Sequence, residues 1–313
     1  MPLEYPHRPV LVDEVVRCLV HFSEGIYVDG TAGTGGHSLA ILKGLTGKGR
    51  LISIDQDPDA IRLSTKRLGP SARSIHVIRA NYSDLDEILE DLGIKEIDGV
   101  LLDLGLSSYQ LEKSGRGFSF AREEPLDMRM DPDNALTAHS LVNDLAPKDL
   151  EKILRDYGEE KRARSIVRAL VRARARRPIE TSSQLAGLIE SVSRRSNRSR
   201  ARHPATQTFQ ALRIAVNREL RNLDTFLDKA PSLIAKGGRL VVLSYHSLED
   251  RRVKRTMVEW EKACSCPPDF PQCVCGKVPL FKRVFKKGVK PSQGEIDENP
   301  RARSAIMRAA ERT

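Results

Sequence analysis

One glycine-rich stretch decides the fold class: Val28-Asp29-Gly30-Thr31-Ala32-Gly33-Thr34-Gly35-Gly36-His37. It follows a short apolar run and leads into a helical pattern. Glycines at a turn from a strand into a helix let the backbone approach a ligand that side chains would exclude. The stretch therefore predicts the ligand-binding turn of an open α/β sheet. NAD(H) and ATP are disfavoured as ligands, because Ser38 stands where the dinucleotide motif requires a third glycine and the Gly-Lys-Ser/Thr of a P-loop is missing.

Strand and helix patterns alternate on both sides of this turn. Four apolar runs predict strands, at residues 26–29, 50–55, 75–79 and 97–103. Helical patterns separate them, at residues 38–45, 58–68 and 83–92. This alternation predicts a doubly wound α/β fold, with a mostly parallel sheet covered by helices on both faces. A fifth strand pattern, residues 239–244, follows a long interval without a convincing strand, so we expect an interrupted sheet.

The interval between the fourth and fifth strands has helical patterns, at residues 159–177, 181–192 and 208–227. On the first of these, arginines recur every four residues beside an apolar face, at Arg164, Arg168 and Arg172. The polar, basic stretch 193–204 predicts a mobile arm that RNA could order. The sequence thus predicts a core domain of residues 1–112 and 218–313 and an inserted helical, basic substrate-recognition domain of residues 113–217.

Composition and charge limit the function classes. The 313 residues are 40% hydrophobic and 30% charged, which is typical of a globular protein. The chain has no apolar run long enough for a membrane span and no targeting pattern, so we expect a cytoplasmic protein with no membrane partner. The net charge is −6 for residues 1–112 and +8 for each of the stretches 113–217 and 218–313. The two basic stretches favour nucleic acid as a partner, although solvated arginine-rich helix faces would look the same.

Two acidic residues end predicted strands. Asp55 comes twenty residues after Gly35, where a carboxylate can accept hydrogen bonds from both ribose hydroxyls and would repel a 2′-phosphate. Asp103 follows the apolar run of the fourth strand, where an acid is costly unless something satisfies it. The alternative for Asp55 is a helix cap, because it and Asp57 precede Pro58. These acids favour an adenosine ligand that lacks a 2′-phosphate.

Several further strings occur in order along the chain: His7-Arg8-Pro9-Val10-Leu11, Leu101-Leu102-Asp103-Leu104-Gly105, Arg116-Gly117-Phe118-Ser119-Phe120, Pro125-Leu126-Asp127-Met128-Arg129-Met130, His203-Pro204-Ala205-Thr206, Ser244-Tyr245-His246-Ser247 and Glu298-Asn299-Pro300-Arg301-Ala302-Arg303-Ser304. With the glycine stretch, they make the chain resemble the bacterial small-subunit (16S) ribosomal RNA cytosine N4-methyltransferases of the MraW or RsmH type. That resemblance implies a Rossmann-like class I S-adenosylmethionine methyltransferase core with an inserted helical domain. It implies donor contacts from seven residues: Gly35, Gly36, His37, Asp55, Tyr82, Asp103 and Gln110.

The resemblance also implies a reaction, methylation of a decoding-centre cytosine in 16S rRNA within the small subunit. The cytosine amine is a poor nucleophile, so an oxygen that accepts its hydrogens must activate it, and Asp103 is our candidate. The same position could instead bind the donor's methionyl amine. Methylation at carbon 5 would require a cysteine nucleophile, and none accompanies Asp103. Thr31, where methyltransferase loops often have glycine, departs from the general pattern.

For several residues the sequence allows two roles, one functional and one structural. The target base must be unpaired or extruded, and Tyr109, Phe118, Phe120 and Tyr245 could stack on it or fill the core. His246 could orient the base or be a hydrogen-bonded structural residue. Cys264, Cys266, Cys273 and Cys275 could hold a structural zinc or form a reduced thiol hairpin, and we assign no metal site from sequence. A DNA amino-methyltransferase, and an RNA-binding protein with a vestigial donor pocket, are the competing functions. The sequence does not decide between a monomer and a homodimer as the oligomeric state.

Overall fold

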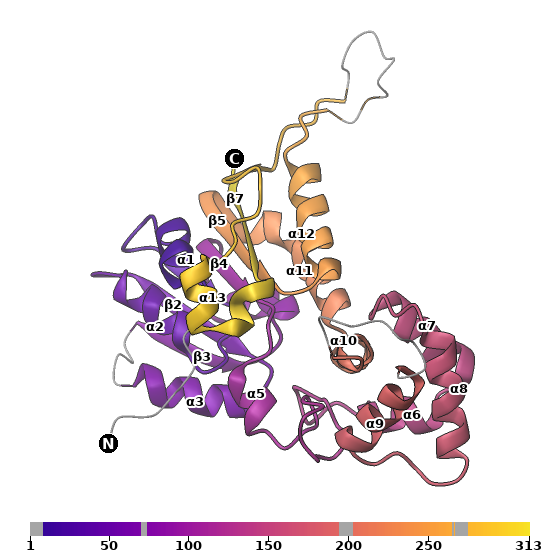
Figure 1. Ribbon diagram of the computed structural model, residues 1–313. Helices are drawn as coiled ribbons and strands as arrows, with labels where there is room; N and C mark the ends of the chain where they lie inside the picture. Colours follow the sequence, from indigo (N-terminus) through magenta and orange to yellow (C-terminus); the bar gives the residue numbers. More distant parts are fainter. Residues whose placement is uncertain (1–8, 70–73, 194–202, 265, 267–274) are drawn as a thin grey trace. The chain divides into compact units, whose positions relative to one another are not determined.

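The computed structural model describes residues 9–69, 74–193, 203–264, 266 and 275–313. The chain divides into two compact units (Figure 1). The first unit comprises Met1–Gly105 and Leu220–Thr313, and the second comprises Leu106–Glu219. The junctions therefore fall at 105/106 and 219/220, where the sequence predicts 112/113 and 217/218. Within the described residues, no helix is both long and apolar enough to span a membrane.

A seven-stranded sheet, ordered β3-β2-β1-β4-β5-β7-β6, forms the centre of the first unit. The strands are β1 (Ile26–Asp29), β2 (Arg50–Asp55), β3 (Ile75–Arg79), β4 (Ile97–Asp103), β5 (Ile234–Ser244), β6 (Phe281–Arg283) and β7 (Ile306–Arg312). Strands β1 to β5 pair in parallel, and β7 pairs antiparallel to both β5 and β6. The predicted mostly parallel α/β sheet is confirmed. The chain runs outward from β1 to β3 and then restarts at β4 beside β1, so a topological switch point lies between β1 and β4.

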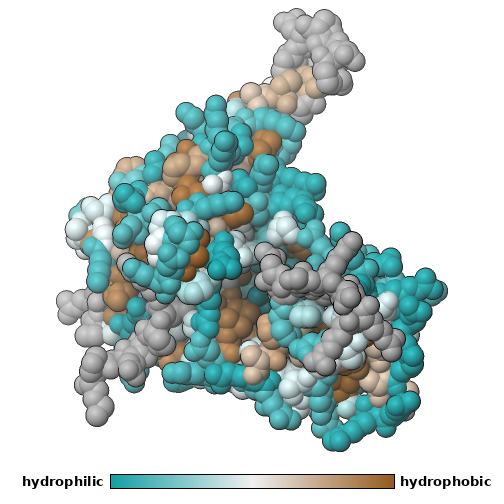
Figure 2. Space-filling model, in the orientation of Figure 1, coloured by the Kyte–Doolittle hydropathy of each residue, from teal (hydrophilic) through white to brown (hydrophobic). Residues whose placement is uncertain are grey.

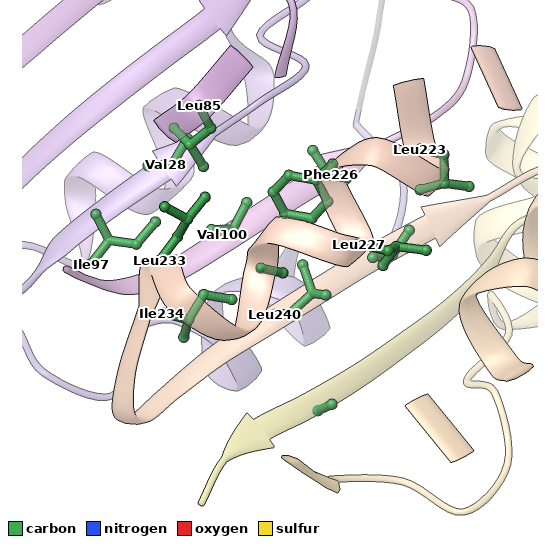
Figure 3. Close-up of a cluster of buried hydrophobic side chains, with 14 of the residues drawn as sticks. Val28, Leu85, Ile97, Val100, Leu223, Phe226, Leu227, Leu233, Ile234 and Leu240 are labelled. Carbon is green, nitrogen blue, oxygen red and sulfur yellow. The ribbon is translucent and has the colours of Figure 1, made fainter. Parts of the chain in front are cut away.

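Both faces of this sheet are buried, because successive strand side chains alternate between two apolar clusters. On one face Val28, Val100 and Leu240 pack with the helices α4 (Leu85–Asp91), α11 (Glu219–Leu233) and α12 (Ser247–Trp260). Figure 3 shows Phe226 and Leu227 of α11 in this cluster. On the other face the neighbouring strand residues pack with α1 (Val12–Leu19) and α2 (Gly36–Lys43). The carboxyl ends of the strands are thereby held as a fixed edge.

The remaining elements of the first unit are α3 (Pro58–Leu68), the short 3₁₀ helix η1 (Tyr82–Asp84), α13 (Gln293–Glu298) and η2 (Pro300–Ser304). The second unit is helical, as the patterns predict. Its helices are α5 (Ser108–Glu112), α6 (Ala138–Asp144), α7 (Pro147–Asp156), α8 (Ala163–Arg174), α9 (Ser182–Ser193) and α10 (Thr206–Asn217). They surround their own apolar cluster, which includes Phe118, Leu150, Ile166 and Leu212. The two units therefore have separate cores.

The single helix predicted over residues 208–227 is wrong. The chain forms α10 and α11 instead, and Arg218 between them has a left-handed backbone with φ 52°. A residue with a left-handed backbone conformation ends an α-helix. The guanidinium of Arg213 donates two hydrogen bonds, both of 2.8 Å, to the Glu219 carboxylate across the break. Apolar residues recur at helical spacing on both sides of Arg218, so the periodicity does not reveal the interruption.

Candidate active site

The glycine-rich loop lies between the ends of β2 and β4. The amide of Gly30 donates a hydrogen bond of 2.9 Å to the Leu101 carbonyl of β4. The amide of Ala32 donates one of 2.8 Å to the Ile54 carbonyl of β2. The loop is therefore attached to both strands that flank β1, at the switch point where open α/β sheets bind their ligands.

The two predicted acids hold the same loop from opposite sides. Asp55 Oδ2 accepts a hydrogen bond of 2.8 Å from the Gly33 amide. On the other side, the Asp103 amide donates one of 2.6 Å to Thr31 Oγ1. Thr31 thus has a task that glycine could not perform, which accounts for its departure from the usual loop. The structure brings Asp55 and Asp103 to one edge of the sheet, as the strand order requires.

Asp55 is not the cap of α3. Its second oxygen, Oδ1, accepts a hydrogen bond of 2.9 Å from the Asp57 amide. Asp57 caps the helix instead, since its Oδ1 accepts one of 3.0 Å from the Asp59 amide. Burial raises the pKa of Asp55 to about 7, against the lowering effect of the two amide donors. Its ionisation state therefore changes near neutral pH.

A buried acid at the base of the loop fixes its start. Asp29 ends β1 and is fully buried. Its Oδ2 accepts a hydrogen bond of 2.5 Å from Ser38 Oγ, which also lies 2.7 Å from Ser53 Oγ. Burial raises the pKa of Asp29. These hydroxyls tie the loop, α2 and β2 together, so buried hydrogen bonds hold the start of the loop.

Gly35 is required by its backbone conformation. Its φ is 77°, in the left-handed region that side chains disfavour, and a Cβ there would lie 3.2 Å from Ser64 Cα. Gly35 is also the N-cap of α2, with no side-chain hydrogen bond to the helix. A Cβ on Gly36 would lie 2.5 Å from Pro9 Cγ. Pro9 thus packs against the start of α2, whose first amides have no partner within the helix and no side-chain cap from Gly35 and can bind an anionic group such as a carboxylate.

Asp103 has two ring neighbours. The hydroxyl of Tyr245, the residue after β5, donates a hydrogen bond to its carboxylate. Burial and this nearby carboxylate raise the pKa of Tyr245 well above its usual value, so the hydroxyl stays protonated. On the other side, His37 Nε2 lies 3.5 Å from Asp103 Oδ2. Tyr245 therefore orients the predicted catalytic carboxylate.

The sequence did not predict this role for Tyr245. The tyrosine was visible only as one aromatic among four, because no local pattern indicates that the end of β5 lies beside the end of β4. The backbone has adapted to the ring, since a Cβ on Gly105 would lie 2.7 Å from a Tyr245 ring carbon. The string Asp103-Leu104-Gly105 thus leaves room for the tyrosine that contacts its own aspartate.

Tyr82 lies beside the start of the loop. Its ring meets the ring of Phe226 edge to face, with centroids 5.9 Å apart. A Cβ on Gly30 would lie 3.1 Å from Tyr82 Cβ. The first unit therefore gathers six of the seven predicted donor contacts, all except Gln110, in or next to the loop and the strand ends.

Gln110 belongs to the second unit. It lies in α5 and forms a capping box, in which Ser107 Oγ accepts a hydrogen bond from the Gln110 amide and Gln110 Oε1 accepts one from the Ser107 amide. Gln110 as a whole residue is 6% exposed. A contact between Gln110 and the donor stays a prediction.

His246 has a structural position. Its Nδ1 accepts a hydrogen bond of 3.4 Å from the Glu249 amide and so caps α12. Its Nε2 lies 3.0 Å from Glu249 Oε1. Glu249 is 2% exposed, and its Oε2 accepts a hydrogen bond of 3.0 Å from the Tyr245 amide. His246 and Glu249 thus fix the backbone that carries Tyr245.

The second unit presents an arginine row on α8. Arg164, Arg168 and Arg172 are exposed along this helix, and Figure 2 shows hydrophilic side chains where α8 lies. Phe118, by contrast, is in the core, and the ring of Phe120 stacks on His203 with centroids 4.1 Å apart. The two phenylalanines pack internally, and the predicted basic arm, residues 193–204, lies mostly outside the described residues.

The sheet order, the antiparallel β7, the glycine loop after β1 and the acids at the ends of β2 and β4 define a Rossmann-like class I methyltransferase. A family model described as the MraW methylase family matches residues 4–313. The chain belongs to this family, as the resemblance predicts. The methyl donor of the family is S-adenosylmethionine.

Similar proteins cover the whole chain. A protein of Desulfosudis oleivorans, named ribosomal RNA small subunit methyltransferase H, is 47% identical over 311 residues, which are 99% of this chain and 100% of that protein. One of the same name from Heliobacterium modesticaldum is 45% identical over 309 residues, 98% and 99% of the two chains. A solved structure described as a putative rRNA-methylase from Clostridium thermocellum has a TM-score of 0.42 and 12% identity, and covers 96% of this chain and 95% of its own.

The residues at the site fit the donor. The His37 side chain is 6% exposed, and neither ring nitrogen has a hydrogen-bond partner among the described residues. Buried polar atoms are normally hydrogen-bonded, and Nε2 has only the 3.5 Å contact with Asp103, so the ring nitrogens beside the loop indicate a place for a polar ligand. The open N-terminus of α2 and the carboxylate of Asp55 supply the complementary groups for a carboxylate and for hydroxyls.

Proposed function

We propose that this protein methylates the N4 amine of a cytosine in small-subunit (16S) ribosomal RNA, in the decoding centre, with S-adenosylmethionine as donor. The observation that carries the proposal is the position of Asp103, whose carboxylate ends β4 at the switch point beside the glycine loop. The names of the similar proteins support ribosomal RNA as the acceptor. Such a substrate places the protein in the cytoplasm.

The first unit binds the methyl donor. Asp55 accepts hydrogen bonds from the ribose hydroxyls, and Tyr82 packs against the adenosyl part. The α2 amides at Gly36 and His37 bind the methionyl carboxylate. A contact from Gln110 is implied by the resemblance alone and stays a prediction. When bound, the donor supplies a methyl group that is already electrophilic, so activation must act on the acceptor.

Asp103 activates the acceptor amine. Its carboxylate accepts one N4 hydrogen, which localises the nitrogen lone pair. With the donor bound, this nitrogen would take the methyl group as the methyl–sulfur bond gives its electron pair to sulfur, and Asp103 would accept the amine proton and release it to solvent. The Tyr245 hydroxyl holds the carboxylate in one orientation during this step. Such fixed alignment is a large part of what a transfer between two bound groups requires.

The described cysteines favour nitrogen over carbon as the acceptor. Methylation at carbon 5 needs a thiolate that attacks the base. Cys18 is buried, and its carbonyl accepts a hydrogen bond from Arg239, which pairs with Gly99 toward the amino end of β4. Cys264, Cys266 and Cys275 follow α12. No described thiol therefore lies at the strand ends that carry Asp103.

The RNA side of the proposal rests on charge. The exposed arginine row of α8 offers guanidinium groups that bind phosphates. A base inside a helix cannot reach a carboxylate at a strand end, so the target cytosine must be unpaired or turned out of its stack. The second unit is then the RNA-recognising unit.

The test is transfer of tritiated methyl groups to purified 16S RNA, to small subunits and to DNA. We expect label on N4 of cytosine in RNA, identified by mass spectrometry of the digested product. Small-subunit RNA from cells without the protein should lack the modification. Label confined to DNA, or found on carbon 5, would reject the proposal.

Two variants assign the role of Asp103. Asp103→Ala should fold normally and lose most turnover. Asp98→Ala is the matched control, because Asp98 lies on the same strand and its Oδ2 accepts a hydrogen bond of 2.7 Å from the Ile26 amide, toward the opposite end of the sheet. Asp98→Ala should lower stability and keep turnover. Unchanged activity in Asp103→Ala would dismiss the catalytic role.

A further inference from the structure

Two segments of the chain lie between α12 and β6: an outgoing arm, which begins at residue 261 and includes residues 261–264, and a returning arm, which includes residues 275–280. The Leu280 amide donates a hydrogen bond of 2.8 Å to the Trp260 carbonyl. The Arg283 guanidinium donates one of 2.7 Å to Glu261 Oε2. These bonds pair the base of the outgoing arm with the base of the returning arm.

Farther out, the arms have little apolar burial to hold them together. Val278 on the returning arm is 70% exposed, and both Cys264 and Cys275 are exposed. Nevertheless the sulfur atoms of Cys264, Cys266 and Cys275 all lie within 4.8 Å of one another. Three thiols from two arms converge where hydrophobic contacts supply no reason for convergence.

The spacing of the sulfurs matches a tetrahedral metal site. Cys264 Sγ and Cys275 Sγ are 3.8 Å apart. In a tetrahedral zinc site with Zn–S bonds of about 2.3 Å, two sulfurs lie about 3.8 Å apart by simple geometry. A disulfide would need a separation of about 2.0 Å. The separation, at which Cys275 Sγ donates a hydrogen bond to Cys264 Sγ, is too long for a disulfide and fits two ligands of one ion.

The local backbone also suits bound thiolates. The Cys266 amide lies 3.3 Å from Cys264 Sγ and donates a hydrogen bond to it. Such donors to a sulfur ligand stabilise its ionised form and orient it toward the metal. On the other arm, Gly276 directly after Cys275 has φ 58°, a turn that glycine makes without strain.

We propose that Cys264, Cys266 and Cys275 bind one Zn²⁺ ion that pins the two arms together. Each thiol loses its proton to solvent and forms one Zn–S bond, so three protons are released and the three thiolates with the ion carry one net negative charge. Lys262 and Lys277, each two residues from a ligand, both pair with Glu259, at 2.6 and 2.8 Å, so the three side chains together carry one positive charge. Cys273 lies outside the described residues, and the proposal does not use it. The site is structural, away from the strand ends that carry Asp103.

Metal content of the full-length protein tests the site. The wild type is purified under reducing conditions, loaded with zinc sulfate and dialysed, and the metal is measured by mass spectrometry of the native protein. We expect one zinc per chain, less than a tenth of that in the double variant Cys264→Ser/Cys275→Ser, and one per chain in the control Cys18→Ala. Co²⁺ in place of zinc should give a thiolate charge-transfer band in the wild type and the control, and none in the double variant.

A chelator makes the test independent of mutation. Treatment of the wild type with EDTA should increase the rate at which a protease cuts the arms, and added zinc should reverse the increase, with unchanged circular dichroism. The proposal fails if the reduced wild type takes up no zinc, if the double variant keeps its zinc, or if the metal-free protein is cut at the same rate. Isolation of a disulfide between these cysteines from a reducing cytoplasm would also overturn it.

Discussion

Replacement of Tyr245 by phenylalanine tests whether the active site depends on an oriented carboxylate. The change removes one hydroxyl and keeps the ring, which packs beside Gly105. The Asp103 carboxylate then loses the donor on the β5 side, while its backbone stays attached to Thr31 Oγ1. Asp103 remains present and ionisable, but its orientation is no longer fixed.

The magnitude follows from the type of bond. A hydrogen bond to a charged group contributes about 1.5–3 kcal/mol. If that contribution is realised in the transition state, kcat falls about 10- to 150-fold, since about 1.4 kcal/mol corresponds to a factor of ten. The Asp103 side chain is 18% exposed, so water can replace the lost donor, and we expect the free energy of unfolding to fall by only about 1 kcal/mol.

The assay is methyl transfer to 16S RNA, with kcat and the KM for the donor measured separately. Tyr27→Phe is the matched control, because the Tyr27 hydroxyl donates a hydrogen bond of 2.9 Å to the Phe22 carbonyl and accepts one of 3.0 Å from the Phe22 amide, away from the strand ends. This control should lose about 1–3 kcal/mol of stability and keep its kcat. A Tyr245→Phe enzyme with kcat within twofold of the wild type would refute the positioning role.

Three further outcomes are expected. The ionised form of Asp55 binds the ribose, and the pKa of Asp55 in the free protein is about 7, so the donor affinity measured by calorimetry should fall about tenfold from pH 8 to pH 6. Because folding raises this pKa, the contribution of Asp55 to the free energy of unfolding should also fall as the pH rises from about 4 to 7. A flat binding profile would contradict the first half. Gly35→Ala should lower the free energy of unfolding by about 1–2 kcal/mol in urea and weaken donor binding, since alanine at φ 77° is strained and its Cβ would meet Ser64. Replacement of the three α8 arginines by glutamine should weaken RNA binding and make it less dependent on salt, with donor affinity unchanged; equal salt slopes would remove α8 from the RNA surface.

The chemistry of the strand ends was readable from local patterns. Parallel strands bring their carboxyl ends to one edge, so the glycine turn after β1 and the acids after β2 and β4 had to lie together once the alternation of strands and helices was recognised. The structure confirms this edge, with Gly33 bonded to Asp55 and Thr31 bonded to Asp103. Two features of the fold were not predicted from the sequence. The strand β7 went unpredicted because Ile306–Arg312 lacks alternation, and the break at Arg218 went unpredicted because apolar spacing continues through it.

The sequence by itself determined strands β1 to β4 and the glycine loop and acids at their ends, because those depend on spacing along the chain. Only the tertiary structure decided which side chains from distant parts of the sequence contact these residues. Tyr245 contacts Asp103 across more than a hundred residues because β5 pairs with β4, and Asp57 rather than Asp55 caps α3. The three cysteine sulfurs lie together on the two arms after α12 and before β6, which are hydrogen-bonded at their base. Such contacts are set by strand pairing and packing, which no local pattern of residues encodes.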